Sequence, residues 1–401
     1  MTPDERRSAF SLASIYALRM LGLFMVMPVF MLEARHYEGG DDLSAIGMAM
    51  GVYGLVQACL QIPFGLAADR FGRKRIIYTG LALLALGSLI GAMATSVTGL
   101  ALGRALQGAG AISAAVTALL ADQTRDEVRT KGTALVGASI GLMFALSLVL
   151  GPLLSGWGGL PAIFGVTLGL ALAGAVIVRW WTPPEPPLPR PEPTGPSLWD
   201  LLVHPDLIRL NFGVFALYAV QLASWVAIPA LLIQAGVAST DHGWVYLPTV
   251  LLSFVVMGVT LFPLERRGQL RPLFLVCIVL VMLVQASWAW MSTDQPSLWV
   301  LAVLLFVFFC GFNVLEASQP SLASRLAPAG SRGAALGVYN TLQSLGIFAG
   351  GAVGGLLLKS QGAVGVFVAS SAVMLVWLAV AWRTRYVSRS PGSRGAAHGK
   401  A

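Results

Sequence analysis

The feature that most constrains this chain is a succession of apolar blocks, each about 20 residues long, separated by short breaks rich in charge, proline or glycine. A helix of about 20 apolar residues crosses the roughly 30 Å hydrocarbon core of a bilayer. Only 11% of the residues are charged, whereas soluble domains carry about 25%. A mean hydropathy of +0.77 over 401 residues is too high for one globular core. The chain is therefore predicted to be an all-α membrane protein.

The blocks predict twelve transmembrane helices. The first six are expected near residues 10–32, 44–67, 76–95, 98–121, 131–155 and 160–180. The second six are expected near residues 208–233, 243–264, 272–291, 297–321, 333–357 and 362–382. The first block is too long for the apolar part of a signal peptide, so we interpret it as an uncleaved helix.

Four regions follow from this division. Residues 1–181 are predicted to form an N-terminal six-helix half and residues 208–383 a C-terminal half. Between them, residues 182–207 are expected to be a cytoplasmic, Pro-rich, extended linker with a short amphipathic helix at 197–202. Residues 384–401 form a basic tail.

The net charge of +8 and pI of 9.8 first suggest a nucleic-acid partner, but the positions of the charges indicate otherwise. Of the 26 Lys and Arg residues, Arg35 and Lys359 fall on one face, and Arg19 and Arg104 lie within spans. All the others fall on the face of the termini. Cytoplasmic loops of membrane proteins collect Lys and Arg. We therefore expect a multi-pass protein of a bacterial inner membrane, with both termini cytoplasmic and no nucleic-acid partner.

The two halves repeat each other. Met27-Pro28 matches Ile228-Pro229, and Lys131-Gly132 matches Arg332-Gly333, both at an offset of 201 residues. A duplicated six-helix half is typical of transporters whose substrate binds near the midplane between the halves.

Three further segments carry a resemblance to a known family. The segment Gly65-Leu-Ala-Ala-Asp69-Arg-Phe-Gly72-Arg73 resembles motif A of the major facilitator superfamily, and Gly103-Arg104-Ala-Leu-Gln107-Gly108 resembles its motif B. Gly141, Gly151-Pro152 and Gly156 resemble motif C of its drug:proton antiporter branch, with Ser147 and Ser155 where glycines are usual. The chain is most similar to the YajR-type group, through segments such as Gln61-Ile-Pro-Phe-Gly65 and Leu210-Asn-Phe-Gly213. The soluble domain known after helix twelve in that group is not expected here.

The resemblance implies a cytoplasmic latch that closes when the central cavity faces outward. Asp69 would then face the N-terminus of helix eleven near Gly333 to Gly337, where an anion meets free N–H groups and the positive end of the helix dipole. The resemblance also implies that Arg73 pairs with Asp122. The latch residues are Gly65, Asp69, Arg70, Gly72, Arg73 and Asp122.

Charged residues inside the spans are the sharpest functional signal, because each costs at least about 2.5–3.5 kcal/mol at the bilayer centre. Arg19, Arg104 and Glu316 are the three. We expect both arginines to face the cavity and to bind anionic groups, and Glu316 to carry the coupling proton, with a purely structural role as the alternative. Polar residues that could line the same cavity are Tyr16, Tyr53, Gln57, Gln107, Tyr218, Gln221, Trp225, Asn313, Asn340 and Gln343.

These observations predict a secondary transporter that exports small amphipathic compounds by proton antiport. The two arginines, and the absence of an acid in the middle of helix one, leave open an uptake or anion-linked transporter. A non-transporting receptor is a third reading, which the gate-like latch disfavours. No enzyme activity, cofactor or metal is expected. The expected partners are a small-molecule substrate, protons and the lipid bilayer, and the protein is expected to be a monomer.

Overall fold

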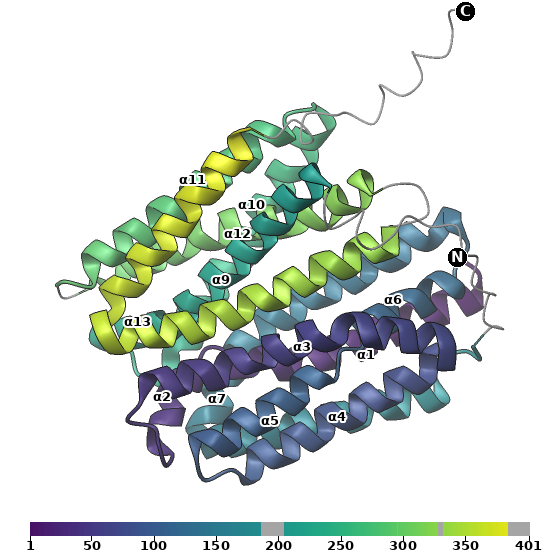
Figure 1. The fold of residues 1–401 in the computed structure, drawn as a ribbon, viewed down its shortest axis with the longest axis horizontal. Helices are drawn as coiled ribbons and strands as arrows, with labels where there is room; N and C mark the ends of the chain where they lie inside the picture. Colours follow the sequence, from purple (N-terminus) through teal and green to yellow (C-terminus); the bar gives the residue numbers. More distant parts are fainter. Residues whose placement is uncertain (186–203, 295, 328–331, 384–401) are drawn as a thin grey trace, which may run out of the picture.

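The computed structural model describes residues 1–185, 204–294, 296–327 and 332–383, and these fold into long helices in two bundles (Figure 1). The short amphipathic helix predicted at 197–202 and the basic tail lie outside the described residues. The N-terminal half contains α1 (Pro3–Val26), α2 (Phe30–Glu33), α3 (Leu43–Phe71), α4 (Arg73–Met93), α5 (Val97–Ala109), α6 (Ser113–Asp122) and α7 (Asp126–Trp180). The C-terminal half contains α9 (Pro205–Gln234), α10 (His242–Arg266), α11 (Leu270–Met291), α12 (Leu298–Leu326) and α13 (Arg332–Trp382). Two short 3-10 helices, η1 (Ala34–His36) and η2 (Ser239–Asp241), complete these halves.

Twelve spans result, because two of the helices contain two spans each. Ten segments among the described residues are long and apolar enough to cross a membrane, and Lys131–Trp180 and Gly333–Trp382 each run for 50 residues. At 1.5 Å per residue, that is about twice the length a bilayer needs. Both helices turn at glycines with non-helical backbone, Gly158 and Gly159 in α7 and Gly362 in α13. The predicted all-α, twelve-span architecture is confirmed.

Two of the predicted helices are interrupted, which the apolar pattern did not indicate. The first ends at Val26 and resumes as α2 at Phe30, around Pro28, which has no N–H to donate to a helix. The fourth is broken between Ala109 and Ser113. A Cβ on Gly110 would lie 2.5 Å from the Gly80 carbonyl oxygen of α4, so the break brings two backbones together.

Several helices also run further than their apolar blocks. The helix α1 begins at Pro3, where Thr2 and Glu5 form a capping box, and α12 continues to Leu326 rather than 321. The helix α9 begins at Pro205, inside the predicted linker. The apolar pattern indicates which part of a helix lies in hydrocarbon. Capping residues decide where the helix ends beyond that part, in water.

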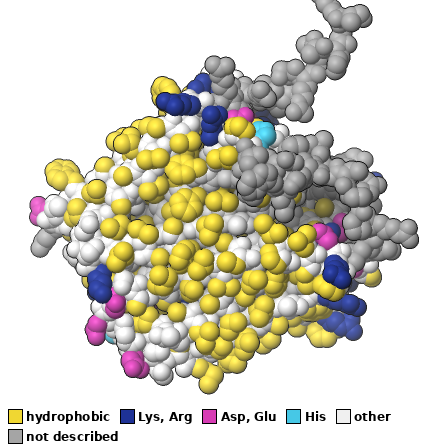
Figure 2. All heavy atoms as spheres, viewed as in Figure 1, with side chains coloured by type: hydrophobic (Ala, Val, Ile, Leu, Met, Phe, Trp, Pro, Cys, Tyr) yellow, Lys and Arg dark blue, Asp and Glu magenta, His cyan; other side chains and the backbone are white. Residues whose placement is uncertain are grey.

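The surface agrees with a membrane protein. Apolar side chains cover the central part of the face in Figure 2, and charged groups gather toward its margins. We name the end that carries Arg6, Arg73 and Arg266 the basic face, and the end that carries Asp42 and Lys359 the opposite face.

The two halves are packed together near the opposite face. A Cβ on Gly47 would lie 2.5 Å from the Gly351 carbonyl oxygen, and one on Gly355 would lie 2.7 Å from Gly47 Cα. These glycines therefore let α3 and α13 touch backbone to backbone. Beyond them Lys359 Nζ lies 3.0 Å from Asp42 Oδ2.

Near the basic face several glycines make no such close contact. A Cβ added at Gly333 or Gly337 of α13, or at Gly137 of α7, would meet no described atom within 4 Å. The same is true of Gly258 in α10, although closer to the opposite face α10 touches α7, where Gly243 lies against Leu148 and Val149. The close glycine contacts between the halves therefore lie toward the opposite face, which they and the Asp42–Lys359 pair hold closed.

Candidate functional site

Two buried arginines of the N-terminal half converge on one tyrosine. Arg19 on α1 donates from one terminal nitrogen to the Tyr53 hydroxyl at 3.3 Å and from the other to Ser113 Oγ at 3.4 Å. The Arg104 guanidinium of α5 lies over the Tyr53 ring, with its central carbon 4.8 Å from the ring centroid. Because α1, α3 and α5 each supply one of these side chains, three spans build one cationic cluster.

Other polar side chains orient this cluster without neutralising it. Arg104 donates to Gln107 Oε1 at 3.0 Å, and the Gln107 amide donates to Ser88 Oγ at 2.9 Å. Tyr16 lies beside Arg19 and Ser113. Among the described residues no carboxylate pairs with either arginine, and the Nε of both is buried without a partner. The cluster therefore keeps donors and positive charge for an acceptor.

The C-terminal half holds a single carboxyl group in the corresponding region. The Tyr218 hydroxyl of α9 donates to Glu316 Oε1 of α12 at 2.6 Å. Tyr339 of α13 lies close to both, and its buried hydroxyl has no described partner. Gln343, one turn further along α13, lies beside Tyr218.

If Glu316 were purely structural, its polar neighbours on α12 would be expected to hydrogen-bond to it, but they bond to other groups. The Asn313 amide donates to Ser253 Oγ on α10 at 2.8 Å, and the Ser318 hydroxyl bonds the Leu315 carbonyl of its own helix. Glu316 is therefore held by tyrosine, and no basic side chain pairs with it among the residues described.

The helix α13 contacts the surroundings of both the arginine cluster and the carboxyl group. Gly54, next to Tyr53 on α3, packs against the Ser344 carbonyl and Ile347 of α13. The next residue back, Gln343, reaches Tyr218. One helix thus contacts both α3, which supplies Tyr53, and α9, which supplies Tyr218, so a shift of α13 would change the surroundings of both groups.

The remaining sequence-predicted cavity residues have different surroundings. Trp225 is buried between Tyr246 and Phe309, with ring centroids 5.2 and 6.4 Å away, so it belongs to an aromatic cluster of the C-terminal half. Gln57 is half-buried with an unbonded amide oxygen, Gln221 is buried, and Asn340 is half-buried. Sequence reasoning missed Ser88, Ser113 and Tyr339, because serine and tyrosine in apolar helices carry no periodic signal of their own.

The turn between α3 and α4 builds a charged cluster at the basic face. Arg73 bridges Asp69, one helical turn before it, and Asp122 Oδ2, which is 3.2 Å from Arg73 Nε. Gly72 supplies the turn with a φ of +104°, a conformation that favours glycine. Gly65 is half-buried against Ala114, and Arg70 lies over the Phe71 ring. The Asp69 carboxylate is exposed, and its described partner is Arg73 rather than α13.

An acidic side chain completes this cluster. The Glu185 carboxylate accepts the backbone N–H groups of Arg73 and Lys74, which caps the first turn of α4. Lys74 Nζ donates to the Thr182 carbonyl at 2.8 Å. The start of the linker is thereby fixed to the N-terminal half.

Comparison with known proteins identifies the architecture. The family model of the Major Facilitator Superfamily matches residues 12–351. The chain is 41% identical to the inner membrane transport protein YajR of Escherichia coli K12 over 384 residues, which is 95% of this chain and 84% of that protein. This chain belongs to the Major Facilitator Superfamily.

Further members of the superfamily show the same relationship at lower identity. The multidrug resistance protein MdtH of Aeromonas salmonicida is 28% identical, with 88% of each chain covered. The solved structure of a D-xylose-proton symporter has a TM-score of 0.79 at 13% identity, covering 95% of this chain and 99% of that one, and supports the fold alone. The superfamily and these relatives are transporters, so the protein is a multi-pass membrane transporter rather than an enzyme, as the sequence predicted.

Proposed function

We propose that this transporter exports small amphipathic compounds carrying an anionic group, in exchange for protons. The observation that carries this proposal is a pair of buried, unneutralised arginines in one half together with a carboxyl group in the other half, Glu316, which has no cationic partner among the described residues. A ligand anion would take the place of the missing counter-charge at Arg19 and Arg104. Charge-assisted hydrogen bonds to such a group contribute about 1.5–3 kcal/mol each.

Glu316 is proposed to carry the proton. A carboxylate without a cation costs several kcal/mol in a low-dielectric site, so protonation is the cheaper way to keep it buried. When Glu316 is exposed to an aqueous face it can release that proton, and the Tyr218 hydroxyl then donates to the charged form. Loading and release on opposite sides would drive alternation between the two states.

Export is favoured over uptake by the relatives, which include multidrug resistance proteins. The proposed residues for the substrate cavity are those of the arginine cluster and the carboxyl group, with Tyr16, Gln107 and Gln343 beside them. The cytoplasmic position of the basic face is part of this proposal, as is the monomeric state.

The test uses inverted membrane vesicles that are acidified inside and report their pH through a dye. Cationic, neutral and anionic amphipathic compounds are added outside. Anionic compounds are expected to collapse the pH gradient, because an exporter moves them inward in exchange for protons. Response to cationic compounds alone would contradict the anionic assignment.

The matched variant is Glu316→Gln, which keeps the shape of the side chain but cannot release a proton. It is expected to bind substrate and exchange it across the membrane, yet to lose accumulation driven by the pH gradient, by about tenfold or more. Glu33→Gln is the control, since Glu33 lies at the opposite face and accepts a hydrogen bond from Ser155 at 2.7 Å. Full gradient-driven transport by Glu316→Gln would exclude Glu316 as the proton carrier.

The arginine cluster also favours a second function, uptake of an anion together with protons. The same vesicles distinguish the two, because a symporter needs the compound inside. A collapse of the gradient that requires preloaded compound would support uptake.

A further inference from the structure

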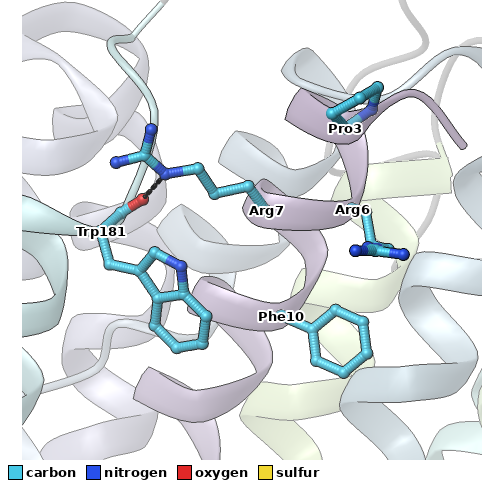
Figure 3. A pocket seen from close by; sticks show the side chains of 5 residues that line it. All are labelled: Pro3, Arg6, Arg7, Phe10 and Trp181. Carbon is cyan, nitrogen blue, oxygen red and sulfur yellow. Dashed lines mark hydrogen bonds between the residues drawn. The ribbon is translucent and has the colours of Figure 1, made fainter.

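A cavity lies at the basic face, outside the central site. It has a volume of about 430 Å³ and is lined by Pro3, Arg6, Arg7 and Phe10 of α1 and by Trp181, just after α7. Figure 3 shows the Phe10 and Trp181 rings beside the two guanidinium groups. We propose that this cavity binds the headgroup of an anionic phospholipid.

The walls of the cavity are held together by Arg7. Its Nε donates to the Trp181 carbonyl at 2.7 Å, and a terminal nitrogen donates to the Trp180 carbonyl at 3.0 Å. These are carbonyls at the end of α7 that have no partner within the helix. The start of α1 is thus tied to the end of α7, and the cavity is a fixed feature of the N-terminal half.

The mouth of the cavity is positively charged, and part of that charge has no described partner. Within the described part of the chain, no hydrogen bond or ion pair engages the exposed Arg6 guanidinium. Arg7 and Arg179 both lie close enough to Lys74 for their positive charges to act on it. Two of the nearby acids are occupied, since Glu5 pairs with Arg125 at 2.8 Å and Glu185 caps α4. Asp4, in the first turn of α1, is the exposed acid that remains beside the arginines.

The cavity lies at the boundary between hydrocarbon and water. The first apolar block begins at Phe10, and the sixth ends at the pair Trp180-Trp181, which are exposed, as interfacial tryptophans are. Leu172, Val176 and Trp180 are exposed at a spacing of four, on one face of α7. An acyl chain can follow that strip while its phosphate reaches the arginines.

This combination distinguishes a lipid from a soluble anion. A free phosphate needs the cations but not the aromatic walls or the apolar strip. Basic pockets between helices at this membrane level suit phospholipid headgroups, and each nearby Lys or Arg adds about 1 kcal/mol of attraction to an anionic surface.

The experiment counts phospholipids bound to the purified full chain by native mass spectrometry. Phosphatidylglycerol and phosphatidylcholine with the same acyl chains are titrated in turn. Wild type is expected to hold phosphatidylglycerol more tightly. Arg6→Gln should raise the dissociation constant about fivefold, and Arg6→Gln with Arg7→Gln should raise it by roughly another fivefold. The control pair Arg266→Gln and Arg267→Gln removes two exposed charges from the end of α10 and should have no effect.

Three results would overturn the proposal. Equal binding of the two lipids would exclude recognition of charge. Displacement of the lipid by millimolar glycerol phosphate would show that the cavity binds a soluble phosphate. A loss of lipid binding in the double variant alone, accompanied by a lower melting temperature, would assign Arg7 a structural role only. Arg6→Gln leaves the Arg7 contacts intact, so it separates loss of lipid binding from loss of structure.

Discussion

At the scale of single residues, Tyr53 offsets part of the cost of burying two positive charges. Each arginine costs at least about 2.5–3.5 kcal/mol in the middle of a bilayer. A cation–π contact with Arg104 returns roughly 0.5–2 kcal/mol, and a hydroxyl bond to Arg19 returns about 1 kcal/mol. The sum remains unfavourable, so other contacts in the fold must offset it. In the proposed function, a bound anion would offset part of it.

The unfavourable free energy of burying the arginines leads to a prediction for Arg104. The variant Arg104→Gln should weaken binding of an anionic substrate by roughly tenfold to a hundredfold, because it removes one charge-assisted interaction. Binding would be measured by calorimetry on the purified protein. Arg35→Gln, at the opposite face, is the matched control. Unchanged affinity in Arg104→Gln would show that the anion binds elsewhere.

The same scale shows what the sequence could and could not indicate about the site. Arg19, Arg104 and Glu316 were predictable, because a charge inside an apolar block has a cost that demands a reason. Their convergence on Tyr53 and Tyr218 was not, because it depends on the rotation of several helices about their axes. Tyr339 was missed for the same reason: a tyrosine in an apolar helix can face lipid, a neighbouring helix or the cavity.

At the scale of elements, α13 carries contacts on opposite sides. Gly351 and Gly355 touch α3, whereas Gly346 and Gly350 lie against Phe215 and Ala219 of α9. Glycines four residues apart in this sequence, such as Gly47/Gly51, Gly137/Gly141, Gly350/Gly354 and Gly351/Gly355, favour close helix packing, and most of them lie in such contacts. Gly137 is the exception, since a Cβ there would have no described neighbour within 4 Å. The spacing of glycines alone cannot indicate which of them lie against a neighbouring helix.

The contact between α3 and α13 predicts the effect of a methyl group. A Cβ at Gly351 would lie 2.7 Å from Gly51 Cα, so Gly351→Ala must push the backbones apart, at a cost of about 1–3 kcal/mol. The closed opposite face should lose population. Spin labels at Glu38 and Ser360, in a Cys59→Ser background, should report longer distances.

Gly337→Ala is the control for that experiment, because its Cβ would be free. If both variants leave the label distance unchanged, the glycine contact does not hold the opposite face closed.

At the scale of the whole molecule, the contacts describe one of two states. The opposite face is closed by glycine contacts and the Asp42–Lys359 pair, while Asp69 is bonded to Arg73 and is separate from α13. The proposed latch would form in the other state, where Asp69 meets the start of α13. The sequence holds the residues for the contacts at the opposite face and for the latch. It cannot indicate which of the two sets is formed in a given state.

The latch predicts that Asp69→Asn disfavours closure of the basic face. An anion at a helix N-terminus contributes about 0.3–2 kcal/mol, so a few-fold loss of the closed population is expected, with a lower transport rate. Disulfide trapping between cysteines placed at Ala67 and Ala334 should slow accordingly. Wild-type trapping and transport in the variant would rule out a latch at Asp69.

The Asp42–Lys359 pair at the opposite face is predicted not to contribute to the pH dependence of transport. The Ser44 hydroxyl and then the Lys359 ammonium hold the pKa of Asp42 well below its usual range. A depressed pKa means that the contact is complete above the usual value and is lost only as pH falls through the depressed one. Asp42→Asn should therefore change transport by the same factor at every pH from about 5 to about 8. A factor that varies over this range would place a pH-dependent gate at Asp42.

The turns at Gly158–Gly159 and at Gly362 also bear on how the protein is made. Each joins two spans with almost no chain between them, so there is no hydrophilic loop to be carried across the membrane at those points. Neither span of such a pair can leave the ribosome and settle in the bilayer long before its partner follows. Spans five and six, and likewise eleven and twelve, must enter the membrane as helical hairpins, which makes each pair a single unit of biogenesis.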